Sequence, residues 1–230
     1  MTAPIAVALD TTDLAQAKQW AELVAPHVST LKVGLELYLR AGASGVEQIR
    51  SSGDNCELFL DLKLHDIPNT VAGAARAVAP LSPGLLTVHA LGGADAISAA
   101  ADALPETRIA GVTILTSMSA ADLVRVGIAG PPVDAVRRLA SLAVNSGARA
   151  LVCSPQEVAA VRAEVGPEIT LITPGVRPAG ADIGDQARVA TPAQAIADGA
   201  DLVVIGRPIT GAADVAAAAA EIGASLAVLA

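Results

Sequence analysis

Aromatic residues are almost missing from this 230-residue chain, which has one Phe, one Trp and one Tyr. Because hydrophobic residues still make up 53% of it, a core sufficient for one large or two small domains must be built from Ala, Val, Leu and Ile. Cysteine is also scarce. Cys56 and Cys153 form no CxxC pair and lie in apolar runs, so we expect two buried, reduced thiols.

Positive charge is in deficit, with 15 Lys and Arg against 23 Asp and Glu. This balance argues against a protein that binds nucleic acid non-specifically, although it is compatible with a local basic pocket for a small anion. No uninterrupted apolar run reaches the roughly 20 residues of a membrane span. The first ten residues lack the basic start of a signal peptide. We therefore expect a soluble, cytoplasmic protein.

Short apolar runs recur about every 28 residues, a spacing that accommodates one strand, one helix and two connections. Near-continuous apolar strands that alternate with helices indicate a parallel sheet covered on its faces. Eight such units favour a single (β/α)8 TIM barrel, with a doubly wound open sheet as the alternative. No linker divides the chain, so we expect one catalytic domain over residues 1–230. The runs are IAVALD, LKVGLEL, ELFLDLK, LLTVHA, IAGVTILT, ARALVCS, TLITPG and DLVVIG.

Two of the connecting segments carry helix-start signals. SPQE at Ser154 and TPAQ at Thr191 each combine a hydroxyl N-cap, a proline and a Glu or Gln three residues on. They predict helices that begin just after Ser154 and Thr191. The loop at 177–186 is long and poor in apolar residues, which makes it a candidate lid.

The third apolar run ends in a dense cluster of charge, LDLKLHD. Asp61 and Lys63 are two apart and share one face of the strand, and Asp66 lies in the turn before Pro68. At the carboxyl end of a barrel strand that face is where such enzymes carry out chemistry. Carboxylates around the Lys63 ammonium favour its charged form, which can donate a proton. The alternative is a structural ion pair.

Two further charges belong to the same end of the predicted barrel. Asp10 ends the first run. Lys32 either points into the opening of the barrel at the carboxyl ends of the strands or merely starts the second strand. If Lys32 points into this opening, it forms with Asp61, Lys63 and Asp66 an array of alternating charge. Such an array would place positive groups beside a substrate anion and a fixed negative group against a departing carboxylate.

Signals for phosphate binding come late in the chain. GVRP at 175–178 follows the seventh run and GRP at 206–208 follows the eighth. Barrels frequently bind phosphate on these two loops, where glycine permits a close backbone approach and arginine supplies a forked donor. No His, Cys and carboxylate set has metal-site spacing, and no Walker loop or GxGxxG indicates a nucleotide cofactor. We expect His65 and His89 to be structural.

Five blocks, spread over nearly the whole chain from VALD to GRPIT, resemble the orotidine 5′-phosphate decarboxylase family, and its bacterial form most of all. LDLKLHDIPNTV matches the family signature of Asp-x-Lys-x-x-Asp followed by Ile-Pro-x-Thr. The resemblance implies a homodimeric barrel with sites at the subunit interface and no metal or cofactor. It also implies conversion of orotidine 5′-monophosphate to UMP in pyrimidine biosynthesis. The other blocks are VTILTSMSAADL, TPGVRP, DQARVATP and GRPIT.

The same resemblance assigns roles to individual residues. Asp61, Lys63 and Asp66 would form the catalytic array, in which Lys63 protonates C6 of the pyrimidine and Asp66 reaches the neighbouring subunit's site. The implied substrate-binding residues are Asp10 and Lys32 at the ribose, Thr70 at the ribose across the dimer, Thr116 and Ser119 at the pyrimidine, and Arg177, Gln186, Gly206 and Arg207 at the phosphate.

Two other functions compete with this interpretation. Magnesium-dependent 3-keto-L-gulonate 6-phosphate decarboxylases and hexulose-6-phosphate synthases share a similar Asp-x-Lys-x-x-Asp core. They need a carboxylate near the mouth of the second strand, where this chain has Lys32 and, close by, only Glu36. A non-catalytic barrel that binds nucleotides or a partner is the second alternative. The complete charged set argues against it.

Overall fold

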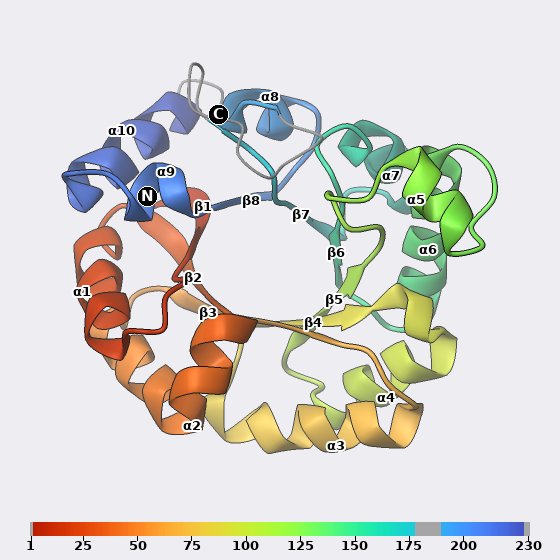
Figure 1. Cartoon of the computed structure of the whole chain (residues 1–230), viewed down its shortest axis with the longest axis horizontal. Helices are drawn as coiled ribbons and strands as arrows, with labels where there is room; N and C mark the ends of the chain where they lie inside the picture. The colour runs from red at the N-terminus through yellow and green to blue at the C-terminus, as the bar shows by residue number, and fades with distance from the viewer. Residues whose placement is uncertain (1, 178–189, 228–230) are drawn as a thin grey trace.

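Eight parallel strands form a closed barrel in the order β1 to β8. The computed structural model describes residues 2–177 and 190–227, and Figure 1 looks into the ring of strands with the helices outside it. The open-sheet alternative is wrong because β1 pairs with β8, with Ile5 opposite Val203 and Val7 opposite Ile205. The strands are β1 (Ala3–Ala8), β2 (Val28–Gly34), β3 (Glu57–Leu64), β4 (Leu85–His89), β5 (Arg108–Val112), β6 (Ala150–Val152), β7 (Thr170–Thr173) and β8 (Leu202–Ile205).

Helices surround the barrel and cover the outer face of its strands (Figure 1). Within the described residues, no helix has the length and apolar character needed to cross a membrane. The α-helices are α1 (Leu14–Val24), α2 (Leu35–Ser52), α3 (Pro68–Val78), α4 (Ala94–Ala103), α5 (Ala120–Arg125), α6 (Pro132–Asn145), α7 (Val158–Val165), α8 (Pro192–Ala197), α9 (Arg207–Thr210) and α10 (Val215–Ala227), with short 3₁₀ turns η1 (Ala79–Leu81) and η2 (Ala90–Gly92).

The core has two parts that reflect the alternation of side chains along each strand. Outward-facing Val, Leu and Ile side chains pack against the helices in the larger cluster. Inside the barrel, the only Phe of the chain, Phe59, packs with Ala6, Leu85, Ala110 and Ile172. One aromatic ring thus packs among alanine, leucine and isoleucine side chains inside the barrel. The space at the carboxyl ends of the strands stays available for polar groups.

One helix-start prediction is confirmed and the other is wrong. Thr191 caps α8, and its Oγ1 accepts from Gln194 N at 3.1 Å. Helix α7 begins at Val158, not directly after Ser154. The buried Ser154 hydroxyl accepts from Gln156 N, two residues on, at 3.2 Å. A serine hydroxyl can close a turn of this kind as well as cap a helix, so the same sequence signal serves both.

The second apolar run is part strand and part helix. Strand β2 starts at Val28 and ends at Gly34, and α2 begins at Leu35, within the run LKVGLEL that predicted a strand. Leu37 continues the apolar pattern, but it is buried on α2. A short apolar run cannot distinguish strand from helix by periodicity alone. Lys32 consequently lies in the carboxyl half of β2 rather than at its start.

Gly111 lets α6 pack closely on β5. A Cβ added at Gly111 would lie 2.7 Å from the Ala143 Cβ and 3.2 Å from Leu151 Cδ2. A contact below 3.0 Å requires a shift, and because the Ala143 Cβ is attached directly to the backbone, β5 and α6 must move apart. Gly111 and Ala143 are therefore matched in size across this interface.

We predict that Gly111→Ala lowers the free energy of unfolding by about 1–3 kcal/mol, because overpacking strains a filled interface. Urea unfolding would measure the loss. In the double variant with Ala143→Gly, the loss should be smaller than the sum of the two single losses. Additive losses would show that the two positions do not share this contact.

Candidate active site

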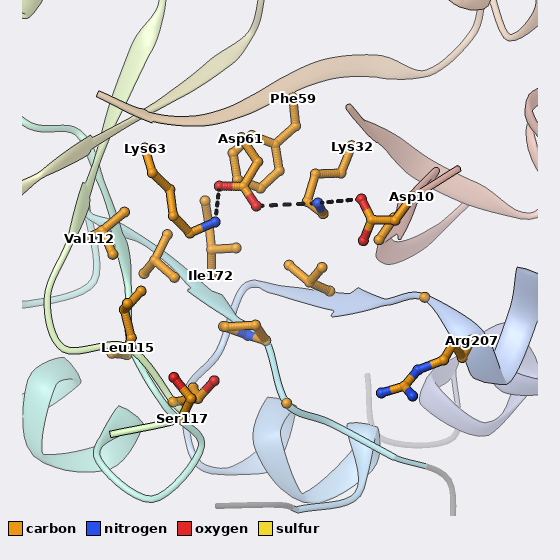
Figure 2. A pocket seen from close by; sticks show the side chains of 18 of the residues that line it. Asp10, Lys32, Phe59, Asp61, Lys63, Val112, Leu115, Ser117, Ile172 and Arg207 are labelled. Atoms are coloured by element: carbon orange, nitrogen blue, oxygen red, sulfur yellow. Dashed lines mark hydrogen bonds and ion pairs between the residues drawn. The ribbon is translucent and has the colours of Figure 1, made fainter. Parts of the chain in front are cut away.

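A cavity of about 530 Å³ opens at the carboxyl ends of the strands, here called the mouth. Its volume lies in the range of small-molecule sites. Figure 2 shows charged side chains along one wall and apolar and hydroxyl groups opposite. The residues lining it are Ala8, Asp10, Lys32, Phe59, Asp61, Lys63, Val112, Ile114, Leu115, Thr116, Ser117, Val152, Cys153, Ile172, Pro174, Gly175, Arg177, Val204, Gly206, Arg207 and Thr210.

Four side chains of alternating charge form a row along this wall (Figure 2). Lys32 is only 5% exposed, and its Nζ lies 3.3 Å from both Asp10 Oδ1 and Asp61 Oδ2. On the other side of Asp61, Oδ1 accepts from Lys63 Nζ at 2.7 Å. Lys32 thus enters the mouth and joins Asp10 to the Asp61–Lys63 pair. We call Asp10, Lys32, Asp61 and Lys63 the charge row.

The charge row keeps Asp61 ionised. Burial raises the pKa of this carboxyl, but the positive charges of Lys32 and Lys63 and their hydrogen bonds outweigh burial and lower it below its ordinary value of 3.8. The carboxylate of Asp61 is therefore held between the side-chain nitrogens of Lys32 and Lys63. The arrangement is a fixed electrostatic field on one wall of a concave site.

The backbone that presents Lys63 is unusual. Lys63 has φ of 46°, a left-handed conformation that side chains other than glycine rarely adopt. Its N–H donates to Thr87 Oγ1 at 2.8 Å. Left-handed non-glycine residues cost free energy and gather at functional sites. From this strained position in β3 the Lys63 side chain reaches Asp61, with its Nζ 2.7 Å from Oδ1.

Arginine side chains reach the cavity from β7 and β8. Arg177 follows β7, and its Nη1 donates to Val176 O at 2.9 Å. Arg207 begins α9 directly after Gly206, and its guanidinium lies apart from the charge row, beyond Asp10 (Figure 2). Both arginines line the cavity, so the structure brings together the two late motifs and the charge row.

Three of the expected site residues, all of them described, do not line the cavity, and a fourth lies outside the described residues. Asp66 and Thr70 are exposed beyond β3, and Asp66 Oδ1 accepts from Ile67 N at 2.7 Å. Ser119 is the N-cap of α5, where its hydroxyl donates to Asp122 Oδ2 at 2.6 Å. Gln186 lies outside the described residues, as does most of the candidate lid at 177–186.

Several cavity residues were missed by the reasoning from sequence. Phe59 and Ile172 form its apolar floor, and Leu115 and Ser117 lie across from the charge row (Figure 2). Strand alternation could have found Phe59, which is two residues before Asp61. No such rule reaches Leu115 and Ser117, because β5 ends at Val112 and they lie in the loop beyond it.

The two histidines near the mouth stack on each other and line no part of the cavity. Their ring centroids are 5.1 Å apart. Burial, and then electrostatic interaction with His65 and Lys63, lower the pKa of His89 below 6.5, and Asp61 opposes this shift. His89 Nδ1 has no hydrogen-bond partner within the described part of the chain. A neutral, stacked His89 fits the expected structural role.

Comparisons with known proteins identify the family of this chain. The model of the orotidine 5′-phosphate decarboxylase / HUMPS family matches residues 3–222. The chain belongs to this family. A relative from Thermobifida fusca named orotidine 5′-phosphate decarboxylase is 69% identical and covers 98% of this chain and 97% of its own. One of the same name from Frankia casuarinae is 56% identical over 97% of this chain and 88% of its own.

Solved structures agree with the sequence relatives. The crystal structure of orotidine 5′-phosphate decarboxylase from Lactobacillus acidophilus has a TM-score of 0.84 and 35% identity, covering 97% of this chain and 99% of its own. The crystal structure of an uncharacterized conserved protein from Geobacillus kaustophilus has a TM-score of 0.83 and 33% identity, and the match covers 97% of this chain and 100% of its own. The resemblance carried by the sequence motifs is confirmed, and the chain is an enzyme.

Proposed function

We propose that this enzyme converts orotidine 5′-monophosphate to UMP in pyrimidine biosynthesis. The observation that carries the proposal is the charge row at the mouth, with Lys63 Nζ at 2.7 Å from Asp61 Oδ1. The family match and the names of the relatives support the same reaction. In this proposal residues 1–230 act as one catalytic domain. A cytoplasmic location fits nucleotide synthesis and the two free cysteines among the described residues.

The chemistry requires stabilisation of charge at one carbon atom. When the bond between C6 and the carboxylate breaks, the electron pair stays on C6 and carbon dioxide leaves. No ring substituent delocalises this pair, so the barrier is very high. Differential stabilisation of about 20 kcal/mol is at the upper end of what enzymes supply. In this chain, a fixed array of charges in a concave site can supply such electrostatic stabilisation.

Lys63 and Asp61 have different roles in the proposed reaction. Lys63 donates a proton from Nζ to C6 and later regains one from solvent. Asp61 holds the Lys63 ammonium in place and presents a fixed negative charge to the substrate carboxylate, which favours its departure. Asp10 and Lys32 bind the ribose, and Thr116 reads the pyrimidine. Ser119, at the edge of the same loop, has this role only by resemblance.

The phosphate is assigned to the loops that follow β7 and β8. Arg177, Arg207 and the Gly206 amide line the cavity there, and Gln186 completes the set by resemblance. Guanidinium groups match phosphate oxygens in geometry and charge. Binding energy from this remote group can be used to assemble the reactive site.

The magnesium-dependent alternative conflicts with the position of Lys32. Its ammonium lies 3.3 Å from Asp10 and from Asp61, between the two carboxylates that a divalent ion would use. Glu36 is exposed on α2 and does not line the cavity. A bound cation would be repelled by Lys32. We therefore propose a reaction without metal or cofactor, in which the chain's own charges supply the catalysis.

A homodimer is the proposed assembly. Asp66 and Thr70 are exposed outside their own cavity, although the family signature includes both. If a second copy brings its mouth against this region, the two side chains can enter the neighbouring site. A two-fold arrangement would make the exchange reciprocal.

The direct test is an assay of purified protein with orotidine 5′-monophosphate, followed by loss of absorbance. We expect turnover that is unchanged by EDTA. Lys63→Ala should reduce kcat at least about 100-fold, because the proton donor is lost, whereas affinity for UMP should change little.

Lys18→Ala is the matched control, since Lys18 is a half-buried lysine on α1 that does not line this cavity. It should retain full activity. Turnover by Lys63→Ala above a tenth of the wild-type value would show that Lys63 is not the essential acid. Activity abolished by EDTA would favour the magnesium-dependent alternative.

Arg207→Ala should reduce kcat/KM for the phosphorylated substrate about 10- to 100-fold, as expected for lost hydrogen bonds between charged groups. Turnover of orotidine, which lacks the phosphate, should be affected much less. Steady-state kinetics on both substrates would measure the difference. Arg138→Ala, which removes an exposed arginine of α6, is the control. Equal losses on both substrates would contradict a phosphate role.

Shared sites can be tested by mixing Lys63→Ala with Asp66→Ala, each inactive alone, under conditions in which subunits exchange. A heterodimer has one site that lacks both groups and one site that is intact. Random exchange makes half the dimers mixed, so about a quarter of wild-type activity should return, by the symmetry of the dimer. Exchange shown by mass spectrometry without recovery would mean that Asp66 serves its own chain.

A further inference from the structure

Strand β3 contains extra residues where it carries Lys63. Leu60 pairs with Leu86, but the next pair joins Leu64 to Val88, so four steps along β3 match two along β4. The extra residues form a bulge, and Lys63 is the bulge residue with positive φ. A bulged residue loses its partner in the regular ladder. Another group must therefore accept the Lys63 N–H.

Thr87 on β4 supplies that acceptor. Its Oγ1 accepts from Lys63 N at 2.8 Å and donates to Asp61 Oδ1 at 3.1 Å. The direction is fixed, because an amide can only donate and an ionised carboxylate can only accept. Thr87 is 0% exposed, so water does not replace either bond. One hydroxyl thus joins the backbone of Lys63 to the carboxylate that pairs with its ammonium.

This link closes a small ring of contacts. Asp61 Oδ1 accepts both from Lys63 Nζ, at 2.7 Å, and from Thr87. Thr87 in turn holds the strained backbone from which the lysine side chain starts. A branched residue at this position has a restricted χ1 angle, which aims the hydroxyl. Loss of the hydroxyl would remove both the acceptor of the Lys63 N–H and one of the hydrogen bonds to Asp61 Oδ1.

We propose that Thr87 is a positioning residue for the reaction, which sets where the Lys63 ammonium and the Asp61 carboxylate lie relative to the substrate. The inference rests on the proposed function, in which these two groups act at C6. Thr87 does not line the cavity, so in this proposal it acts through Lys63 and Asp61 and not by contact with the substrate. Its effect should therefore appear in kcat and not in binding, because small displacements of reacting groups slow a reaction strongly.

The experiment compares Thr87→Val, which keeps the shape but loses the hydroxyl, with Thr87→Ser, which keeps the hydroxyl. Thr87→Val should reduce kcat about 10- to 100-fold, and KM and affinity for UMP should stay within about twofold. Thr87→Ser should recover most of kcat. Thr113→Val is the matched control, since Thr113 is another fully buried threonine, and its hydroxyl donates to Val152 O at 2.8 Å.

A second measurement does not depend on the substrate. Hydrogen exchange at the Lys63 amide should accelerate at least about tenfold in Thr87→Val and stay unchanged in Thr113→Val and Thr87→Ser. Wild-type kcat in Thr87→Val, or an equal loss in Thr113→Val, would overturn the proposal. An unchanged hydrogen-exchange rate of the Lys63 amide in Thr87→Val would also overturn it. If wild type itself fails to turn over orotidine 5′-monophosphate, the proposed function is wrong, and amide exchange still decides whether Thr87 holds the bulge.

Discussion

A buried ammonium group requires negative charge around it, and the site is organised around that requirement at Lys32. Removing this charge from water would be unfavourable without Asp10 and Asp61, which lie 3.3 Å away on either side. The same contact stabilises the Asp61 carboxylate, which in turn orients Lys63. Each charge of the row therefore depends on its neighbour. The row supplies a field that is already in place before any substrate binds.

The barrel makes this row possible because it collects separate segments at one end. Asp10, Lys32 and Asp61 come from three successive units of the chain, yet parallel pairing in register brings the ends of β1, β2 and β3 together. Gly206 and Arg207 arrive from the eighth unit only because β8 closes against β1. The two late arginine motifs and the early charged motifs thus face one cavity, and the arginines lie on the loops where barrels frequently bind phosphate.

The bulge in β3 shows how a local departure from regular structure serves such a site. A regular strand would place Lys63 two residues beyond Asp61 on the same face and at the same spacing as any other pair. The left-handed backbone at Lys63 instead brings its Nζ within 2.7 Å of Asp61. The cost of that conformation is offset in part by the hydrogen bond from its N–H to Thr87.

Strand spacing in the sequence favoured a barrel over an open sheet, and the pairing of β1 with β8 decided it. The LDLKLHDIPNT motif, a local feature of the chain, indicated the family and three charged residues of the site. The sequence could not decide whether Lys32 entered the mouth, since one apolar run covered both the end of β2 and the start of α2. The SPQE signal also predicted a helix directly after Ser154, where the chain forms a turn before α7 begins at Val158. Only the tertiary structure revealed Thr87 as the partner of Lys63 and Asp61, because that contact depends on an irregular register between β3 and β4 that no periodicity encodes.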